Sequence, residues 1–151
     1  ILISKSTKNK IGPFELGADG SGADALELAT GTNEIVMNGA KVLTFAMDVV
    51  PNNVNKLLKK IKIDKKNIHK FIFHQASKYI LDNINRRLSI EKNKTFENYG
   101  KVGNTISASI PIALKDAYTR RKISVDKNII VAGYGVGLSW GSALIKWSKL
   151  L

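Results

Sequence analysis

A histidine and an asparagine are the side chains of this sequence best placed to do chemistry. His74 ends the apolar run of residues 71–73, and Asn104 follows Gly103 just before an apolar helical pattern. We expect both where a strand gives way to a helix, which is where open α/β sheets bind ligands. A neutral imidazole and an amide can each donate a hydrogen bond to one developing oxyanion, as thioester enolate chemistry requires. The chain has no cysteine. The nucleophile of such a site is therefore missing, and we interpret the chain as half of an enzyme.

A glycine-rich segment is a third candidate wall of this site. We expect a loop whose backbone N–H groups face the oxyanion, formed by Gly133, Tyr134, Gly135, Val136 and Gly137. A second glycine-rich stretch, residues 17–22, lacks the Gly-Lys-Ser/Thr ending of a phosphate loop, and we interpret it as a structural surface loop. His69 is assigned no role.

The periodicity of apolar residues predicts the elements that position these side chains. Helices are expected over residues 40–58, with a kink or a new first turn at Pro51, over 77–88, and over 107–121, with Pro111 in its first turns. Strands are expected over Ile1–Ser4, 71–73, 128–131 and 139–147, a polar loop over 91–101, and a capped turn at Asp64. Strand–helix units of this kind predict an α/β fold with a mixed sheet.

Composition narrows the class of protein. The 151 residues are 44% hydrophobic, which fits one globular domain with a real core. No apolar run approaches the roughly 18 residues of a membrane span, and no signal peptide is visible, so a cytoplasmic location is expected. The formal charge of +12 is spread along the chain, densest over residues 56–66. This spread favours an acidic protein partner or a phosphate-bearing ligand over nucleic acid.

Three segments closely resemble signatures of β-ketoacyl-acyl carrier protein synthase III. They are residues 73–76, 103–111 and 133–141, and residues 17–23 and 37–39 resemble earlier landmarks of that family. The resemblance spans about residues 14–147 in the family's order. It implies a single domain over residues 1–151, the C-terminal half of a thiolase-like fold, with a mixed five-stranded sheet and covering helices. The N-terminal half, which carries the cysteine, would lie outside this chain.

The resemblance also implies a reaction. In such enzymes the cysteine takes an acyl group from acyl-CoA, malonyl-acyl carrier protein loses CO₂, and its carbanion attacks the acyl thioester. His74 and Asn104 match the residues that hold the malonyl thioester carbonyl as it becomes an enolate, and Tyr134 resembles the aromatic beside them. The implied partners are acyl carrier protein, acyl-CoA and a second copy in a homodimer. No metal is implied, and no cofactor apart from the CoA- and phosphopantetheine-bound substrates.

Some positions depart from the family pattern. The carrier-protein and CoA contacts are expected at Gly39 and at the segment Gln75, Ala76, Ser77, Lys78 and Tyr79. Within that segment, Ser77 stands in place of the usual asparagine and Tyr79 in place of the usual arginine, while Lys78 could supply a displaced charge. Ala40 and Val136 replace a common asparagine and a common glycine. The condensation residues are retained, whereas the acyl donor, the carrier protein and the chain length are left open.

Two other functions are compatible with these residues. One is a thiolase-fold acyltransferase that does not decarboxylate, which Asn104 disfavours because simple acyl transfer chiefly needs a histidine base. The other is a non-catalytic half that contributes a binding surface or a dimer scaffold, which the absence of cysteine supports. In either case we expect a half-enzyme on its own to expose a large apolar face and to associate.

Overall fold

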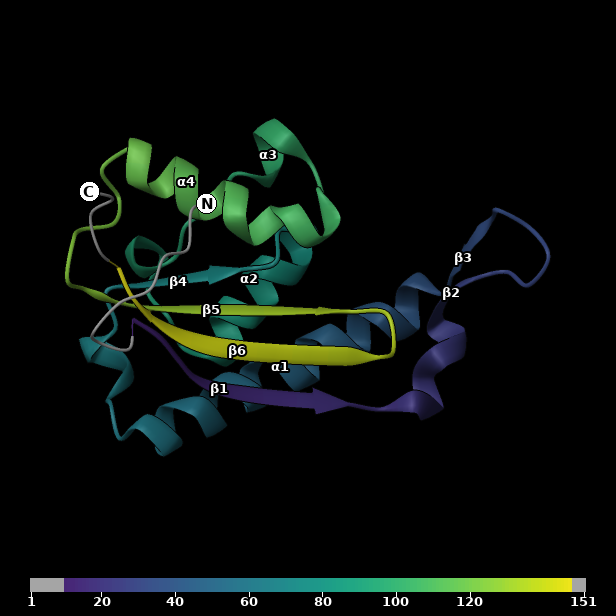
Figure 1. Cartoon of the computed structure of the whole chain (residues 1–151), viewed down its shortest axis with the longest axis horizontal. Helices are drawn as coiled ribbons and strands as arrows, with labels where there is room; N and C mark the ends of the chain where they lie inside the picture. The colour runs from purple at the N-terminus through teal and green to yellow at the C-terminus, as the bar shows by residue number, and fades with distance from the viewer. Residues whose placement is uncertain (1–9, 148–151) are drawn as a thin grey trace.

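A four-stranded mixed sheet forms the centre of the computed structural model, which describes residues 10–147. Its strand order is β1-β6-β5-β4, built from β1 (Ile11–Ala18), β6 (Ser139–Lys146), β5 (Asn128–Gly135) and β4 (Lys70–Phe73). β4 runs parallel to β5, and the other pairs are antiparallel (Figure 1). The mixed α/β sheet is confirmed. The strand predicted over Ile1–Ser4 lies outside the described residues.

The expected fifth strand is absent from the sheet of residues 10–147. Beside the free edge of β4, Thr95 makes a single parallel bridge to Phe71, and the Phe96 N–H donates to the Phe71 carbonyl over 3.4 Å. A turn, η3 (Lys92–Lys94), precedes this bridge, and the short helix α3 (Tyr99–Val102) follows it. The place of a fifth strand is therefore taken by one bridge, because turn-forming residues on both sides stop the pairing.

The sequence did not reveal β1, which pairs with β6 from Ile11 opposite Ile145 to Ala18 opposite Ser139. Pro13 and two glycines obscure its pattern. Proline is tolerated there because β1 is an edge strand with an irregular register between Ile11 and Phe14. The predicted surface loop at 17–22 is only partly correct. Its first two residues finish β1, and the 3₁₀ helix η1 (Gly20–Ala25) follows.

A small hairpin, β2 (Leu26–Leu28) and β3 (Ile35–Met37), projects beyond the carboxyl ends of β4 and β5 (Figure 1). Next comes α1 (Gly39–Ile61), whose first turn is capped by Asn38 Oδ1 accepting from the Lys41 N–H at 3.1 Å. The predicted helix is confirmed, but α1 continues through Pro51 without a new first turn. Burial of Val50, Val54 and Leu57 in one stripe offsets the cost of an interior proline.

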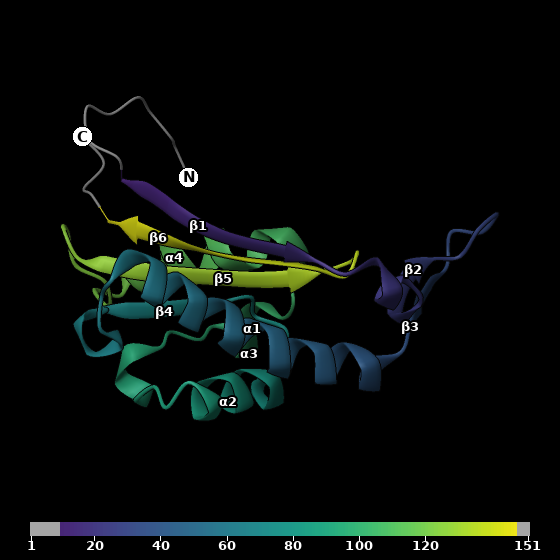
Figure 2. The same ribbon diagram turned by 90° about the horizontal axis from the view of Figure 1, so that it is seen from below.

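The helices cover the sheet on both faces (Figure 2). Helices α1 and α2 (Lys78–Arg87) enclose one core with alternate residues of β4 and β5, including Phe71, Phe73, Ile130 and Ala132. Helix α4 (Ser109–Thr119) encloses a second core with Ile72, Ala113, Leu114, Ala117 and Ile129. The period-two alternation of the strands sends successive side chains to opposite cores.

The remaining predicted helices and turns agree with the structure to within a few residues, whereas the polar loop predicted over 91–101 contains η3 and most of α3. Ser77 is the cap of α2, since its hydroxyl accepts from the Ile80 N–H at 3.3 Å. The helix predicted from 107 starts as the 3₁₀ turn η4 (Ile106–Ala108) and continues as α4. Asp64 caps the turn η2 (Lys65–Asn67) by accepting from the Lys66 N–H at 2.9 Å, as expected.

Candidate functional site

His74 directly follows β4. Its backbone N–H donates to the Ala132 carbonyl at 2.9 Å, so the ladder to β5 holds its backbone in place. The side chain is half-buried, and burial lowers the pKa of the imidazole below its ordinary value of 6.5. Loss of hydration disfavours the charged ring. His74 is therefore neutral near pH 7, with a hydrogen on only one of its ring nitrogens.

Two side chains fix the orientation of this ring. The Nδ1 atom of His74 lies 2.6 Å from the hydroxyl oxygen of Ser109, the first residue of α4. The ring of Tyr134 on β5 stands edge-on to it, with centroids 5.3 Å apart and planes at 90°. Tyr134 holds one side of the imidazole, and Ser109 holds Nδ1. Nε2 is therefore the ring nitrogen that is available to a ligand.

Asn104 does not follow a strand, and this expectation was wrong. It follows α3 and Gly103, whose φ of 69° lies in the left-handed region that favours glycine. A Cβ at position 103 would meet nothing within 4 Å, so the φ of Gly103 is the reason for glycine there. The exposed Asn104 side chain accepts the Ile106 N–H on Oδ1 at 2.9 Å. Its carbonyl oxygen is thus used locally, and its NH₂ group keeps its donors.

His74 and Asn104 come to the same end of the sheet through α4. This helix begins beside the carboxyl end of β4 and runs back along the sheet (Figure 1). Asn104 precedes Ser109 by one turn of 3₁₀ helix, and Ser109 contacts His74. Within residues 10–147 no hydrogen bond joins His74 to Asn104 directly. The two donors are connected through the start of α4, and not as neighbours on adjacent strands.

The glycine-rich segment is mostly strand. Gly133, Tyr134 and Gly135 end β5 and pair with residues 139–141 of β6, so the expectation of a loop over 133–137 was wrong. Pairing of β5 with β6 continues beyond residue 131, where the sequence pattern predicted the strand to end, because only a short turn joins the two strands. Val136 and Gly137 lie in this turn, with Val136 exposed.

Gly133 makes the approach of two elements possible. A Cβ atom at this position would lie 3.2 Å from Ile110 Cδ1 and 3.9 Å from His74 Cβ. With a Cβ at position 133, the end of the Ile110 side chain would have to shift by a few tenths of an ångström. Gly133 therefore leaves room for close packing of Ile110 and His74 against β5.

The segment after His74 divides into buried and exposed positions. Gln75 is 0% exposed: its Nε2 donates to the Phe73 carbonyl at 2.7 Å, and its Oε1 accepts from the Asn98 N–H at 3.0 Å. The Gln75 side chain therefore holds the 96–98 loop and has no exposed surface in the described residues, and a role of Gln75 in binding a carrier protein or CoA stays a prediction.

The other expected contact positions reach the surface. Ala76 and Ser77 are half-buried, Lys78 pairs with Asp82 at 2.8 Å, and Tyr79 is 61% exposed. Gly39 opens α1 at the base of the hairpin and is exposed, as is Ala40. A role of these positions in binding stays a prediction.

Sequence reasoning missed several residues of the site. Ser109 is noted in the sequence only as part of the signature segment 103–111, and Asn98 only as part of the polar loop 91–101, because the contacts of both residues link distant segments. The sequence predicts Phe45 only as one of the apolar residues of the helix over 40–58. In the structure its ring packs edge-on against Tyr134, with ring centroids 6.1 Å apart, and against Trp140, with centroids 5.6 Å apart. Phe45 thus links Trp140 to Tyr134, and Tyr134 contacts His74.

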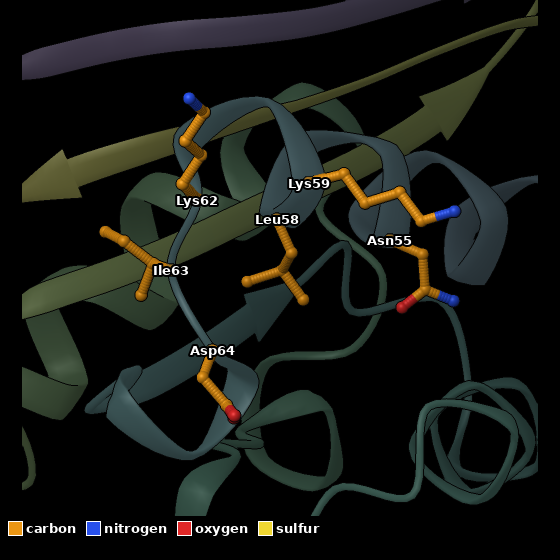
Figure 3. A pocket seen from close by; sticks show the side chains of 6 residues that line it. All are labelled: Asn55, Leu58, Lys59, Lys62, Ile63 and Asp64. Atoms are coloured by element: carbon orange, nitrogen blue, oxygen red, sulfur yellow. The ribbon is translucent and has the colours of Figure 1, made fainter.

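A hollow of about 450 Å³ lies elsewhere, at the carboxyl end of α1 (Figure 3). It is lined by Asn55, Leu58, Lys59, Lys62, Ile63 and Asp64. The turn η2 connects this end of α1 to the start of β4, so the hollow and His74 lie at opposite ends of that strand. Within residues 10–147, no three His, Asp or Glu side chains are grouped as metal ligands. No helix in that range is both long and apolar enough for a bilayer.

Residues 58–147 match the family described as "3-Oxoacyl-[acyl-carrier-protein (ACP)] synthase III C terminal". The chain belongs to this family. The beta-ketoacyl-[acyl-carrier-protein] synthase III of Natranaerobius thermophilus is 42% identical over 148 residues, which cover 89% of this chain and 45% of the relative. The synthase III of Staphylococcus epidermidis strain RP62A is 35% identical over 136 residues, covering 90% and 44%.

Solved synthase III structures show the same architecture. A 2.1 Å crystal structure of a 3-oxoacyl-(acyl-carrier-protein) synthase III superposes with a TM-score of 0.91 at 27% identity, covering 97% of this chain and 50% of that one. The Aquifex aeolicus enzyme gives 0.88 at 30% identity, covering 94% and 46%. The chain thus spans about half the length of its synthase III relatives and corresponds to their C-terminal, thiolase-like half.

Proposed function

We propose that this chain is the catalytic C-terminal half of a decarboxylating condensing enzyme, which joins an acyl-CoA primer to malonyl-acyl carrier protein. The observation that carries the proposal is the neutral His74, oriented by Ser109 and Tyr134 with Nε2 available. Asn104 keeps two N–H donors at the same end of the sheet. A neutral pair of donors suits a thioester oxygen that gains negative charge.

The reaction divides between the two halves. A cysteine of the other half accepts the acyl group from acyl-CoA and releases CoA. The malonyl thioester then loses CO₂, and the electrons of the broken C–C bond form an enolate whose oxygen accepts from His74 Nε2 and Asn104 Nδ2. The α-carbon attacks the acyl-cysteine carbonyl, and the thiolate leaves. Neutral donors lower the energy of the enolate. Neither donor carries a proton acidic enough to be transferred to the enolate carbon.

The position of the other half is supported by an uncovered part of the sheet. Next to α4, Phe14 is 50% exposed and Leu16 75% exposed on β1. They border a shallow apolar hollow of about 140 Å³ that also contacts Ile110 and Gly133. Because Gly133 lies against His74, a second half packed on this face would bring its own residues beside the imidazole. An exposed apolar surface of this kind marks an interface.

The test uses the full-length protein and follows CO₂ release from malonyl-acyl carrier protein. His74→Ala and Asn104→Ala are each expected to lower the rate by about 10²–10³ through loss of one oxyanion donor. His69→Gln and Asn67→Ala, both before β4 at the end of the strand opposite His74, are the controls and keep the wild-type rate. Unchanged decarboxylation in His74→Ala would overturn the assigned role. Product formation without CO₂ release, from an acceptor that is not malonyl, would instead support the acyltransferase alternative.

A further inference from the structure

The hydroxyl of Ser109 is buried against His74. Ser109 is 1% exposed, and its Oγ lies 2.6 Å from His74 Nδ1. Although Ser109 opens α4, it does not cap the helix: the cap position is Ala108, which makes no side-chain bond. The hydroxyl is therefore free of the role that serine usually has at the start of a helix.

The hydrogens around this oxygen can be assigned. A serine hydroxyl donates one hydrogen bond and accepts up to two. The Gln75 N–H donates to Ser109 Oγ at 3.4 Å, which occupies one acceptor position. Among residues 10–147 no carbonyl oxygen accepts from this hydroxyl, including that of Thr105, the partner four residues earlier that helical serines often use. Since a buried hydroxyl hydrogen needs an acceptor, the remaining polar neighbour, His74 Nδ1, has to be that acceptor.

We infer that Ser109 is a positioning residue that donates its hydroxyl hydrogen to His74 Nδ1 and thereby holds the imidazole in the tautomer with its hydrogen on Nε2. A nitrogen that accepts cannot carry a hydrogen, so a neutral ring must carry it on the other nitrogen. For its meaning in catalysis this inference rests on the proposed function, where Nε2–H donates to the thioester oxygen. The assignment of the hydrogen itself does not depend on the reaction.

The surrounding contacts favour the same assignment. Burial of His74 disfavours the imidazolium, in which both nitrogens would donate. The edge-on ring of Tyr134 limits rotation of the imidazole, so a ring flip that exchanged Nδ1 and Nε2 is hindered. Ser109 also follows Asn104 in one short segment, so the start of α4 sets both the tautomer of one donor and the position of the other.

The tautomer is measurable in the full-length protein labelled with ¹⁵N in the histidine rings. Long-range ¹H–¹⁵N spectra distinguish a protonated from an unprotonated ring nitrogen, and His74 is assigned by comparison with His74→Asn. We expect the wild type to show Nε2 protonated and Nδ1 unprotonated at pH 7.5. In Ser109→Ala, where Nδ1 loses its donor, both tautomers should appear. Ser109→Thr, which keeps the hydroxyl, should restore the wild-type pattern.

Ser142→Ala is the matched control, because Ser142 is 3% exposed and its hydroxyl has no partner among the described residues. This variant should keep the Nε2–H tautomer. Decarboxylation should fall about 10-fold or more in Ser109→Ala and recover in Ser109→Thr. A wild-type His74 with its hydrogen on Nδ1 overturns the inference, even if Ser109→Ala fails to fold. A single Nε2–H tautomer in folded Ser109→Ala does the same. A wild type that holds the Nε2–H tautomer without decarboxylating malonyl-acyl carrier protein overturns the proposed function and leaves the Ser109 inference standing.

Discussion

Tyr134 stands edge-on to His74, with ring centroids 5.3 Å apart and planes at 90°. Phe45 from α1 contacts the same tyrosine at 6.1 Å, so an aromatic chain extends from the α1 core to the imidazole. The Tyr134 hydroxyl is buried and has no hydrogen-bond partner among residues 10–147. Burial raises its pKa to about 12, so the phenol stays neutral. The ring of Tyr134 therefore supports His74, while its hydroxyl adds no contact.

Removal of that hydroxyl is expected to stabilise the protein. Tyr134→Phe keeps the edge-on ring and eliminates a buried, unpaired polar group, so the free energy of unfolding should rise by about 1 kcal/mol. Tyr134→Ala removes the ring and should lower it by about 3–5 kcal/mol. Urea denaturation measures both changes. Tyr118→Phe, at an exposed tyrosine, is the control and should stay within about 0.5 kcal/mol. A destabilised Tyr134→Phe would show that the hydroxyl has a partner.

Gln75 is expected to act on the loop that leads to Asn104. In Gln75→Leu, the leucine side chain fills a similar volume but cannot accept a hydrogen bond. The Asn98 N–H is then left buried without a partner. We expect a loss of about 1–3 kcal/mol in stability and faster hydrogen exchange at the Asn98 amide. Asn83→Ala removes the hydrogen bond that the Asn83 side-chain amide donates to the Tyr79 carbonyl on the surface of α2, and it is the control. Unchanged protection of Asn98 in Gln75→Leu would contradict this role.

The neutral state of His74 predicts a pH dependence of stability. Its pKa in the folded protein lies below the ordinary value of 6.5, so between these two values the unfolded chain binds more protons than the folded one. Stability therefore falls as the pH drops through this window, by up to about 1.4 kcal/mol per pH unit for one proton. Burial lowers the pKa of His69 as well, so that residue contributes with the same sign.

Denaturation of matched variants between pH 5 and 7 separates the two histidines. The slope of the unfolding free energy against pH should be smaller in His74→Asn and in His69→Gln than in the wild type. The double variant should lose both contributions. Asparagine and glutamine do not titrate, so any slope that remains comes from carboxylates. A wild-type slope retained in the double variant would mean that neither histidine resists protonation in the folded state.

The uncovered sheet face predicts association of the 151-residue chain on its own. Leu16, 75% exposed beside α4, should pack against a second copy when the other half is missing. Leu16→Asp should lower the associated fraction at micromolar concentration, as measured by sedimentation velocity. Val125→Asp, an equally drastic change at an exposed side chain in the turn before β5, is the control and should leave association unchanged. A monomeric wild-type chain would count against the apolar face as an interface.

Local pattern was sufficient for the elements with a strong apolar period. The stripe through α1, the buried run of β4 and the cap residue Asp64 can be predicted from the sequence because each depends on neighbours along the chain. Motif order was also sufficient for the family and for its C-terminal half. By contrast, the sequence did not predict β1. Pro13 and the glycines of β1 break the alternation of apolar and polar residues, and the pairing of β1 with β6 is a long-range contact.

Tertiary structure decided which side chains meet. Sequence singled out His74 and Asn104 by type, and predicted that two strands would bring them together. In the structure the start of α4 connects them instead, through the contact of Ser109 with His74, and Gly133 leaves room for it. Sequence likewise placed Gln75 at a partner surface, whereas packing buries it as a link to Asn98. Residue types and local periods are properties of the chain itself. Burial, tautomer and hydrogen-bond partners depend on segments distant along the chain, so only the folded protein determines them.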